Sequence, residues 1–124
     1  MQKNSGKLIL IVDDSKDNQD LLKLVLISKG YSVHCASNGQ EALVMLFELS
    51  ILPDLILLDA KMPVMDGYEF RVQQKKLARI RDIPVVVMTG DSDENMGKDM
   101  DEPCGVLIKP LHMNSIIEVI TTHI

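Results

Sequence analysis

The chain has 124 residues, of which 46% are hydrophobic and 25% are charged, so it is long enough to bury one hydrophobic core but too short for two ordinary domains. Its net charge of -5, with no basic stripe to offset it, disfavours direct binding to a nucleic acid. Because the longest apolar runs are far shorter than a membrane span and residues 1–7 lack a signal-peptide core, we expect a single cytoplasmic domain over residues 1–124, without membrane contact.

In the first half of the chain, short apolar runs alternate with amphipathic segments. Residues 8–12 are apolar throughout, which predicts a strand buried on both faces. Apolar side chains recur at helical spacing over residues 16–29, and Gly30 follows, as is typical where a helix ends with positive φ. Residues 32–36 predict a second strand, and residues 40–49 predict a second helix. We expect the buried face of that helix to consist of Ala42, Leu43, Leu46 and Phe47.

The second half of the chain continues the alternation. Residues 55–58 and residues 84–88 form apolar runs that predict a third and a fourth strand, and residues 106–108 predict a fifth. Helices are expected at residues 68–77, after a turn, and at residues 112–122, where the chain closes with an amphipathic segment. We expect the buried face of this last helix to consist of Met113, Ile116, Ile117 and Ile120.

Five buried strands that alternate with helices predict an α/β fold with a doubly wound parallel sheet, because right-handed crossovers place helices on both of its faces. In such sheets, ligand sites lie beyond the carboxyl ends of the strands, where the winding direction reverses. For each polar residue at these ends taken alone, capping a helix, ending a strand or contacting solvent is the better explanation. Their convergence on one edge favours a shared site. The residues are Asp13, Asp14, Asp59, Thr89 and Lys109.

Three carboxylates at one edge repel one another, since two like charges about 4 Å apart cost roughly 4 kcal/mol at an effective dielectric constant of about 20. A Mg²⁺ ion bound by carboxylates and a phosphate usually offsets such charge in phosphoryl transfer, and Lys109 supplies a further positive charge. A carboxylate is then a competent nucleophile toward phosphorus. Asp59 is the candidate nucleophile because it stands on the central one of these strands, and Thr89 can donate its hydroxyl to a phosphoryl oxygen.

Four segments resemble, in order along the chain, the signature segments of response-regulator receiver domains, and the similarity covers nearly the whole chain. The resemblance implies a flavodoxin-like (βα)5 receiver fold with the strand order 2-1-3-4-5. It also implies a single phosphoacceptor signalling domain that catalyses its own phosphorylation and dephosphorylation, and not an enzyme acting on other substrates. The four segments are LILIVDDSKDNQDLL, PDLILLDAKMPVMDGYE, IPVVVMTG and LIKP.

The resemblance further implies roles for individual residues and partners. Asp59 is the implied phosphoacceptor, Thr89 carries the switch hydroxyl, and Lys109 binds the phosphate and precedes a cis-proline, Pro110. The implied phosphodonor is a histidine kinase, a histidine phosphotransfer protein or a small acyl phosphate, and the output is a downstream protein partner. Mg²⁺ is the implied cofactor. Its implied ligands are the carboxylates of Asp13, Asp14 and Asp59 and the backbone carbonyl of Lys61.

The sequence departs from the family pattern three positions before Lys109. Receivers commonly carry an aromatic residue there, and this chain has Val106. Two interpretations stay open. In one, ordering of the acidic residues 91–102 reports phosphorylation in place of the rotation of an aromatic side chain. In the other, Val106 is an ordinary core residue, and the partner-binding surface does not change on phosphorylation.

Two other functions are compatible with parts of the pattern. A phosphatase of the haloacid dehalogenase type also uses an aspartate nucleophile, but it needs a second Asp two residues later, where this chain has Lys61. A pseudo-receiver would keep the fold and act by protein contact alone, independently of phosphorylation. Whether the chain acts by itself or within a longer protein is also open.

Overall fold

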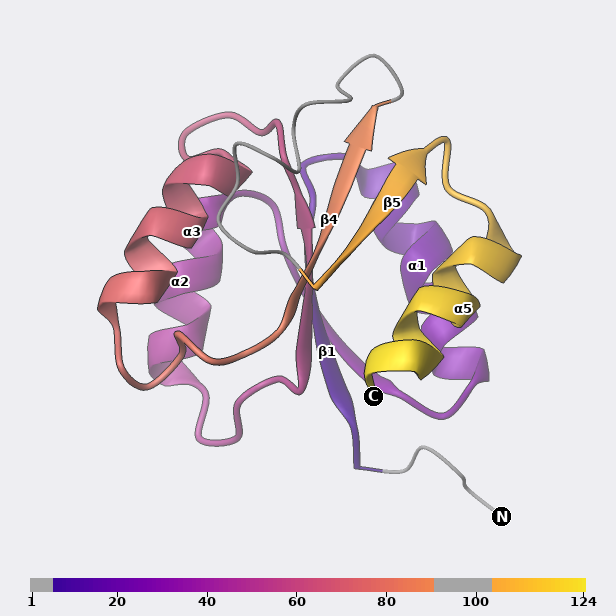
Figure 1. The fold of residues 1–124 in the computed structure, drawn as a ribbon, viewed down its shortest axis with the longest axis horizontal. Coiled ribbons are helices and arrows are strands. Elements are labelled where there is room, and N and C mark those ends of the chain that lie inside the picture. Colours follow the sequence, from indigo (N-terminus) through magenta and orange to yellow (C-terminus); the bar gives the residue numbers. More distant parts are fainter. Residues whose placement is uncertain (1–5, 91–103) are drawn as a thin grey trace.

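The computed structural model describes residues 6–90 and 104–124, which form one parallel sheet between two layers of helices (Figure 1). The sheet has five strands in the order β2-β1-β3-β4-β5, which confirms both the predicted fold class and the expected strand order. The strands are β1 (Leu8–Val12), β2 (Ser32–Ala36), β3 (Leu55–Asp59), β4 (Val85–Gly90) and β5 (Gly105–Lys109).

The helices connect the strands and cover both faces of the sheet, as Figure 1 shows. Within the described ranges, none of them has both the length and the apolar character that crossing a bilayer requires. They are α1 (Lys16–Ser28), α2 (Gly39–Glu48), α3 (Gly67–Lys76) and α5 (Met113–His123).

Successive side chains of the central strands point to opposite faces of the sheet, and this divides the core into two clusters, one on each face. In β1, Leu10 and Val12 pack with residues of α2 and α3, whereas Ile9 and Ile11 pack with residues of α1 and α5. The same alternation continues in β3 and β4, and every residue of β1 and β3 is buried. Burying one such aliphatic side chain contributes about 1.5–3 kcal/mol, so these two clusters supply most of the drive to fold.

The two edge strands correct the prediction that all five strands are buried. In β2, Ser32 and His34 are exposed, and in β5, Val106 and Ile108 are exposed. β2 and β5 are the edge strands, each with a neighbouring strand on one side alone, so some of their side chains reach solvent. Burial on both faces therefore holds for the three inner strands.

Each of the first three helices begins at a residue that caps it. The Ser15 hydroxyl accepts from the backbone N–H of Asn18 at the start of α1, and the Asn38 side chain does the same for Glu41 at the start of α2. Asp66 starts α3 with a capping box. Such caps contribute about 1 kcal/mol each. After α1, Gly30 has φ +96°, as its position predicted.

Two expected core residues are exposed instead. Phe47 was expected on the buried face of α2, but it is 74% exposed, because Ala42 and Leu46 face the sheet and Phe47 is turned about 100° from Leu46 around the helix. Met113 was expected on the buried face of α5, but it is 55% exposed in the first turn of that helix. The buried side chains of α5 are those of Ile116 and Ile120.

Candidate functional site

The carboxyl ends of the inner strands bring the predicted site residues to one edge of the sheet. Asp13 directly follows β1, Asp59 is the last residue of β3, and Thr89 lies at the end of β4. The winding direction reverses between β1 and β3, which is where ligands bind in this class of sheet. A cavity of about 280 Å³ opens there, and its lining includes Asp14, Asp59, Lys61, Thr89, Gly90 and Lys109.

Three carboxylates converge on this edge. Asp13, Asp14 and Asp59 each offer one oxygen, and these oxygens lie within 4.8 Å of one another. Asp13 and Asp59 are buried, whereas Asp14 is exposed at the rim. Burial, and next the charge of Asp13, raise the pKa of Asp59 to about 6, although Lys109 and the backbone N–H of Lys61 oppose this rise. The ionised form of Asp59 is therefore disfavoured, mainly by burial and next by the charge of Asp13.

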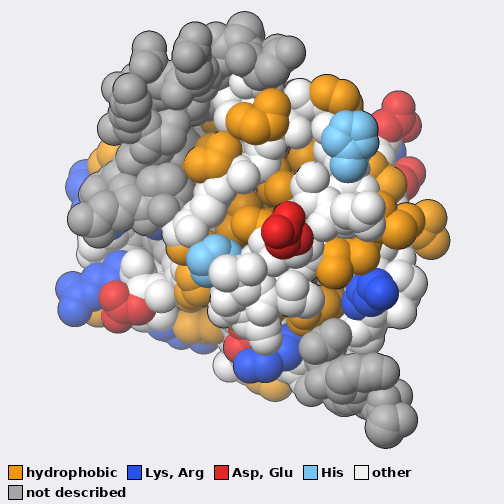
Figure 2. Space-filling model, turned by 45° about the vertical axis from the view of Figure 1, so that its right-hand side comes forward, with side chains coloured by type: hydrophobic (Ala, Val, Ile, Leu, Met, Phe, Trp, Pro, Cys, Tyr) orange, Lys and Arg blue, Asp and Glu red, His pale blue; other side chains and the backbone are white. Residues whose placement is uncertain are grey.

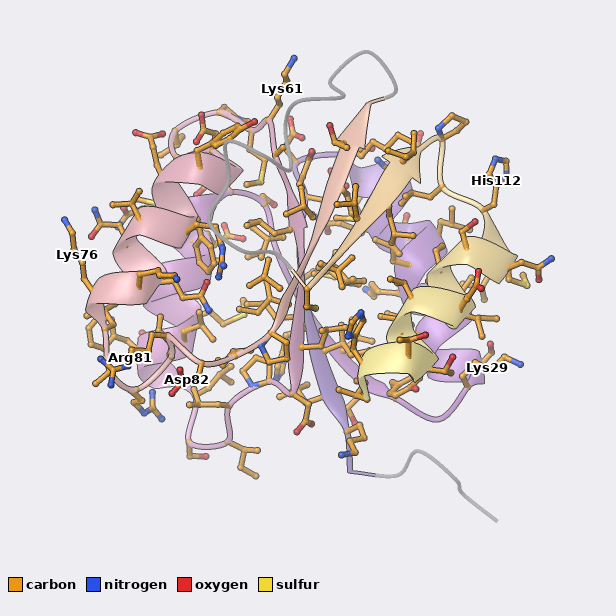
Figure 3. All side chains as sticks on the ribbon, in the orientation of Figure 1. Lys29, Lys61, Lys76, Arg81, Asp82 and His112 are labelled. Atoms are coloured by element: carbon orange, nitrogen blue, oxygen red, sulfur yellow. The ribbon has the colours of Figure 1, made fainter. Side chains whose placement is uncertain are left out.

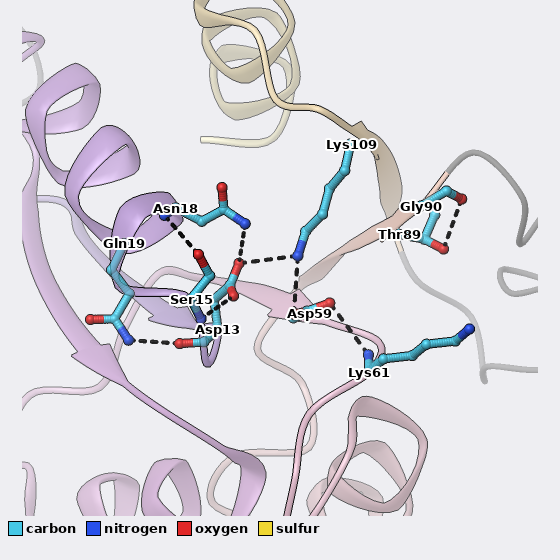
Figure 4. A network of polar contacts seen from close by, with 9 residues as sticks. All are labelled: Asp13, Ser15, Asn18, Gln19, Asp59, Lys61, Thr89, Gly90 and Lys109. Atoms are coloured by element: carbon cyan, nitrogen blue, oxygen red, sulfur yellow. Dashed lines mark hydrogen bonds and ion pairs between the residues drawn. The ribbon is translucent and has the colours of Figure 1, made fainter.

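Lys109 reaches the carboxylates from the end of β5 (Figure 4). Its Nζ lies 3.1 Å from Oδ2 of Asp59 and 3.4 Å from Oδ2 of Asp13. Burial by itself lowers the pKa of Lys109, but the contacts with Asp59 and Asp13 together outweigh burial and raise that pKa above its ordinary value. Lys109 is thus held as a cation between the two carboxylates. The bond that follows it, to Pro110, is cis, as the resemblance implied.

The start of α1 fixes the position of Asp13. The backbone N–H of Ser15 donates to Oδ1 of Asp13 at 2.8 Å, and Nδ2 of Asn18 donates to Oδ2 at 3.3 Å. Nε2 of Gln19, a buried side chain, donates to the backbone oxygen of Asp13 at 2.6 Å (Figure 4). Sequence reasoning missed Asn18 and Gln19. A signal was available, since polar residues in the first turn of a helix that follows a strand-end Asp point back toward it.

The loop after β3 holds Asp59 from the other side. The backbone N–H of Lys61 donates to Oδ1 of Asp59 at 3.3 Å, which places the backbone of Lys61 at the rim of the cavity. Its side chain extends away from the carboxylates (Figures 3 and 4). Farther along, the N–H of Gly67 donates to the backbone oxygen of Ala60 at 3.0 Å, which closes the loop at the start of α3.

The tip of this loop is a tight turn fastened to α2. The N–H of Met65 donates to the backbone oxygen of Pro63 at 2.7 Å, and Val64 between them has φ +68°, as in a γ-turn of the rare positive-φ kind. The backbone oxygen of Met65 then accepts from the N–H of Gly39 at 2.9 Å. A Cβ atom at Gly39 would lie 2.8 Å from Cγ of Met65 and 2.9 Å from that oxygen, so the close contact requires glycine.

Thr89 and Gly90 complete the cavity at the end of β4. The Thr89 side chain is buried, and its hydroxyl lies 3.4 Å from the backbone oxygen of Gly90. All six residues predicted for the site therefore lie around one cavity or in direct contact with its lining: Asp13, Asp14, Asp59, Lys61, Thr89 and Lys109.

Val106 is not among the residues that line this cavity. It is 43% exposed and lines a groove between β5 and α5 together with His112, Glu118 and His123, so its interpretation as a core residue is wrong. Figure 2 shows the side of the molecule that carries α5, where apolar side chains lie among histidine and acidic side chains. The alternative interpretation, ordering of residues 91–102, concerns residues outside the described ranges.

Comparison with known proteins gives a consistent result. The sequence profile of the response regulator receiver domain matches residues 9–121. The chain is 36% identical over 123 residues to the protein described as "Probable transcriptional regulator ycf29" of Pyropia yezoensis, covering 94% of this chain and 52% of that protein. It is 34% identical over 85 residues to the sensor histidine kinase CheAY of Helicobacter pylori, covering 68% of this chain and 11% of that protein.

Solved structures also share the fold. The signal receiver domain of a signal transduction histidine kinase from Syntrophus aciditrophicus has a TM-score of 0.84 and 31% sequence identity, covering 94% of this chain and 89% of that chain. The two curated relatives are longer proteins, of which this chain spans 11% and 52%. What those proteins do as a whole therefore does not transfer directly to this chain.

Proposed function

Because the chain belongs to the response regulator receiver family, a family of signalling domains in two-component systems, we propose that it accepts a phosphoryl group on Asp59. The observation that carries the proposal is the environment of Asp59. Its buried carboxylate lies 3.1 Å from Nζ of Lys109, in a cavity that Thr89 also lines. A nucleophile, a cation and a hydroxyl donor thus face the same space, as transfer of a phosphoryl group requires.

The residues at this edge fit a divalent cation, which we propose is Mg²⁺. Carboxylate and carbonyl oxygens are the ligands that Mg²⁺ prefers, and three carboxylates offer oxygens within 4.8 Å of one another. Burial, and next the charge of Asp13, raise the pKa of Asp59, so a bound cation would favour its ionised form. When bound, Mg²⁺ supplies positive charge beside the transferring phosphoryl group. The proposed ligands are Asp13, Asp14, Asp59 and the backbone carbonyl of Lys61.

The proposed transfer uses the ionised form of Asp59. A carboxylate oxygen forms a bond to phosphorus while the bond from phosphorus to an imidazole nitrogen of the donor breaks, and the imidazole leaves with that electron pair. Lys109 remains close enough to donate to a phosphoryl oxygen, and the Thr89 hydroxyl turns from the Gly90 carbonyl to do the same. That reorientation links the chemistry to the end of β4. A protein-interaction surface then responds to phosphorylation.

The proposed partners follow from this chemistry. The donor is a histidine kinase or a histidine phosphotransfer protein, and two of the similar proteins described above are a histidine kinase and the receiver domain of one. The output passes to a downstream protein, and neither a nucleic acid nor a membrane takes part directly. We propose that the reaction takes place in the cytoplasm, on a single receiver domain spanning residues 1–124.

The test is to incubate the protein with Mg²⁺ and acetyl phosphate and to measure its intact mass, with Asp59→Asn as the matched control. We expect one added phosphoryl group that hydrolyses with time. The adduct should form neither on the variant nor in the presence of EDTA. If no adduct forms and Mg²⁺ does not bind, the proposal is wrong, and a phosphorylation-independent pseudo-receiver becomes the better description.

A further inference from the structure

An apolar cavity of about 140 Å³ lies where α2 and α3 end, and the proposed phosphoacceptor chemistry does not use it. A cavity of about this size can hold a benzene molecule, so one large apolar side chain fits into it. In a parallel α/β sheet the helices end at the edge opposite the carboxyl ends of the strands, which separates this cavity from Asp59. We call it the α2–α3 pocket. Its apolar lining consists of Leu43, Leu46, Phe47, Leu77, Ala78 and Ile80.

Exposed apolar side chains occur along the α2 side of the α2–α3 pocket and in the segment after α2. Phe47, which lines it, is 74% exposed, and Val44, one turn earlier in α2, is 47% exposed. Ile51, in the segment that follows α2, is 72% exposed. Val44 and Phe47 are three positions apart on α2, so they are neighbours on its surface, whereas Ile51 lies beyond the end of the helix. An apolar surface of this kind, next to a cavity, is typical of a site that contacts another molecule.

The pocket is preformed, because hydrogen bonds fix both of its walls. Nη1 of Arg79 donates to the backbone oxygen of Leu46 at 2.7 Å, and Nη2 donates to that of Leu49 at 2.6 Å, so the segment after α3 is tied to the end of α2. The buried side chain of Gln74 donates to the backbone oxygen of Ile80 at 2.9 Å. Binding of a partner should therefore cost little conformational entropy, because this surface is already ordered.

The charges around the pocket are mainly positive, in a chain whose net charge is -5. Lys75, Lys76, Arg79 and Arg81 are all exposed and lie within the last turn of α3 and the segment after it. Figure 3 shows Lys76 and Arg81 near the end of α3, with Asp82 beside them and Lys61 at the opposite end of the molecule. Part of this charge complements the C-terminal ends of the helices, and the remainder faces solvent.

We infer that the α2–α3 pocket docks an acidic, amphipathic segment of a partner protein. The segment inserts one large apolar side chain between Phe47 and Ala78, packs its remaining apolar face on Val44 and Ile51, and places its carboxylates near Lys76 and Arg81. Because the pocket lies at the edge of the sheet opposite Asp59, docking is independent of phosphorylation. It would hold the receiver beside a partner in both phosphorylation states.

The experiment is an NMR titration of the ¹⁵N-labelled protein with two synthetic helical peptides. One carries Glu on its polar face and Leu or Phe on its apolar face, and the other has every Glu replaced by Lys. We expect the acidic peptide to shift the amide signals of residues 43–51 and 77–81 and the basic peptide to leave them unchanged. Phosphorylation of Asp59 with acetyl phosphate should change the affinity for the acidic peptide less than twofold.

Two pairs of variants test the contacts. Phe47→Ser should weaken binding of the acidic peptide about tenfold, whereas Leu24→Ser, at an exposed apolar position on α1, should not change it. Replacing both Lys76 and Arg81 by Glu should also weaken binding about tenfold, whereas Lys29→Glu, on the far side of the molecule in Figure 3, should have no effect. All of these positions are exposed, so folding should be retained.

Several outcomes would overturn the inference. One is no binding of the acidic peptide at millimolar concentration, and another is equal binding of both peptides. A third is a shift of the same amides with protein concentration alone, which would assign the pocket to a second copy of the chain. A fourth is a shift of these amides by a uridine oligonucleotide, which would assign the positive charges to a nucleic acid.

Discussion

Asp59→Asn should make the metal-free protein more stable at neutral pH, although it removes the proposed phosphoacceptor. The pKa of Asp59 rises from 3.8 to about 6 in the folded protein, chiefly because its carboxylate is buried and next because Asp13 is close. One pKa unit corresponds to about 1.4 kcal/mol, so the ionised side chain destabilises the fold by on the order of 2–3 kcal/mol at pH 7. Asparagine has nearly the same shape and no charge, and Lys109 keeps its contact with Asp13.

The size of this stabilisation depends on pH. Because the pKa of Asp59 is higher in the folded protein than in the unfolded chain, the folded state binds more protons between pH 4 and pH 6, roughly. Stability of the natural sequence therefore falls as pH rises through this window, and asparagine escapes that loss. The difference between the two proteins should be largest above pH 7 and should vanish below about pH 4.

Urea unfolding in EDTA at pH 7.5 and pH 4, together with thermal unfolding, measures this difference. A gain of about 2 kcal/mol should raise Tm by roughly 6–10 °C in a domain of this size. Mg²⁺ should stabilise the natural protein and have much less effect on the variant, since the proposed Mg²⁺ site of the folded state includes Asp59. Asp20→Asn, at an exposed carboxylate on α1, is the control and should change stability by less than about 0.5 kcal/mol. A variant no more stable than the natural protein at pH 7.5 would refute the argument that the buried charge of Asp59 destabilises the fold.

Three further predictions concern the residues around the site. Lys109→Met should reduce the rate at which acetyl phosphate labels Asp59 at least about 100-fold at saturating Mg²⁺, because a cation facing the transferring group is lost. Intact mass measures the labelling, and labelling at the natural rate would exclude this role of Lys109. Gly39→Ala should destabilise the protein by about 1–3 kcal/mol in urea unfolding, because its Cβ meets Met65 at 2.8 Å, and unchanged stability would mean that the loop moves freely. Val64→Gly should stabilise by up to about 1 kcal/mol, since φ +68° strains a β-branched residue, and a loss of stability in the same assay would contradict this.

The sequence was most informative about the middle of the sheet. Strands that are buried on both faces have a continuous apolar pattern, so β1, β3 and β4 could be located within one or two residues, and the polar residues at their ends could be placed at one edge. The roles of those residues in phosphoryl transfer stay predictions. Their grouping follows from topology alone, since the carboxyl ends of parallel strands meet.

Exposure at the margins of the fold could not be predicted in the same way. Phe47 and Met113 have the spacing of core residues, but how far a helix turns or extends past the sheet depends on packing that periodicity does not record. Gln19 was missed because apolar periodicity does not mark it: its signal is a polar side chain in the first turn of α1, which donates to the backbone of Asp13 and to Ser37. The α2–α3 pocket depends on Arg79 bonding to carbonyls some 30 residues earlier, at Leu46 and Leu49, a contact between distant segments.

The division of the core by the sheet has an evolutionary consequence. Leu22 and Phe70 belong to different clusters, on opposite faces, and the strands between them keep their side chains apart. Substitutions that do not share neighbours usually add in their effects on stability. One face can therefore accumulate changes that suit a new partner while the other retains its packing, and each layer of helices can diverge at its own rate. A duplicated gene could in this way acquire a new binding specificity without first losing its fold.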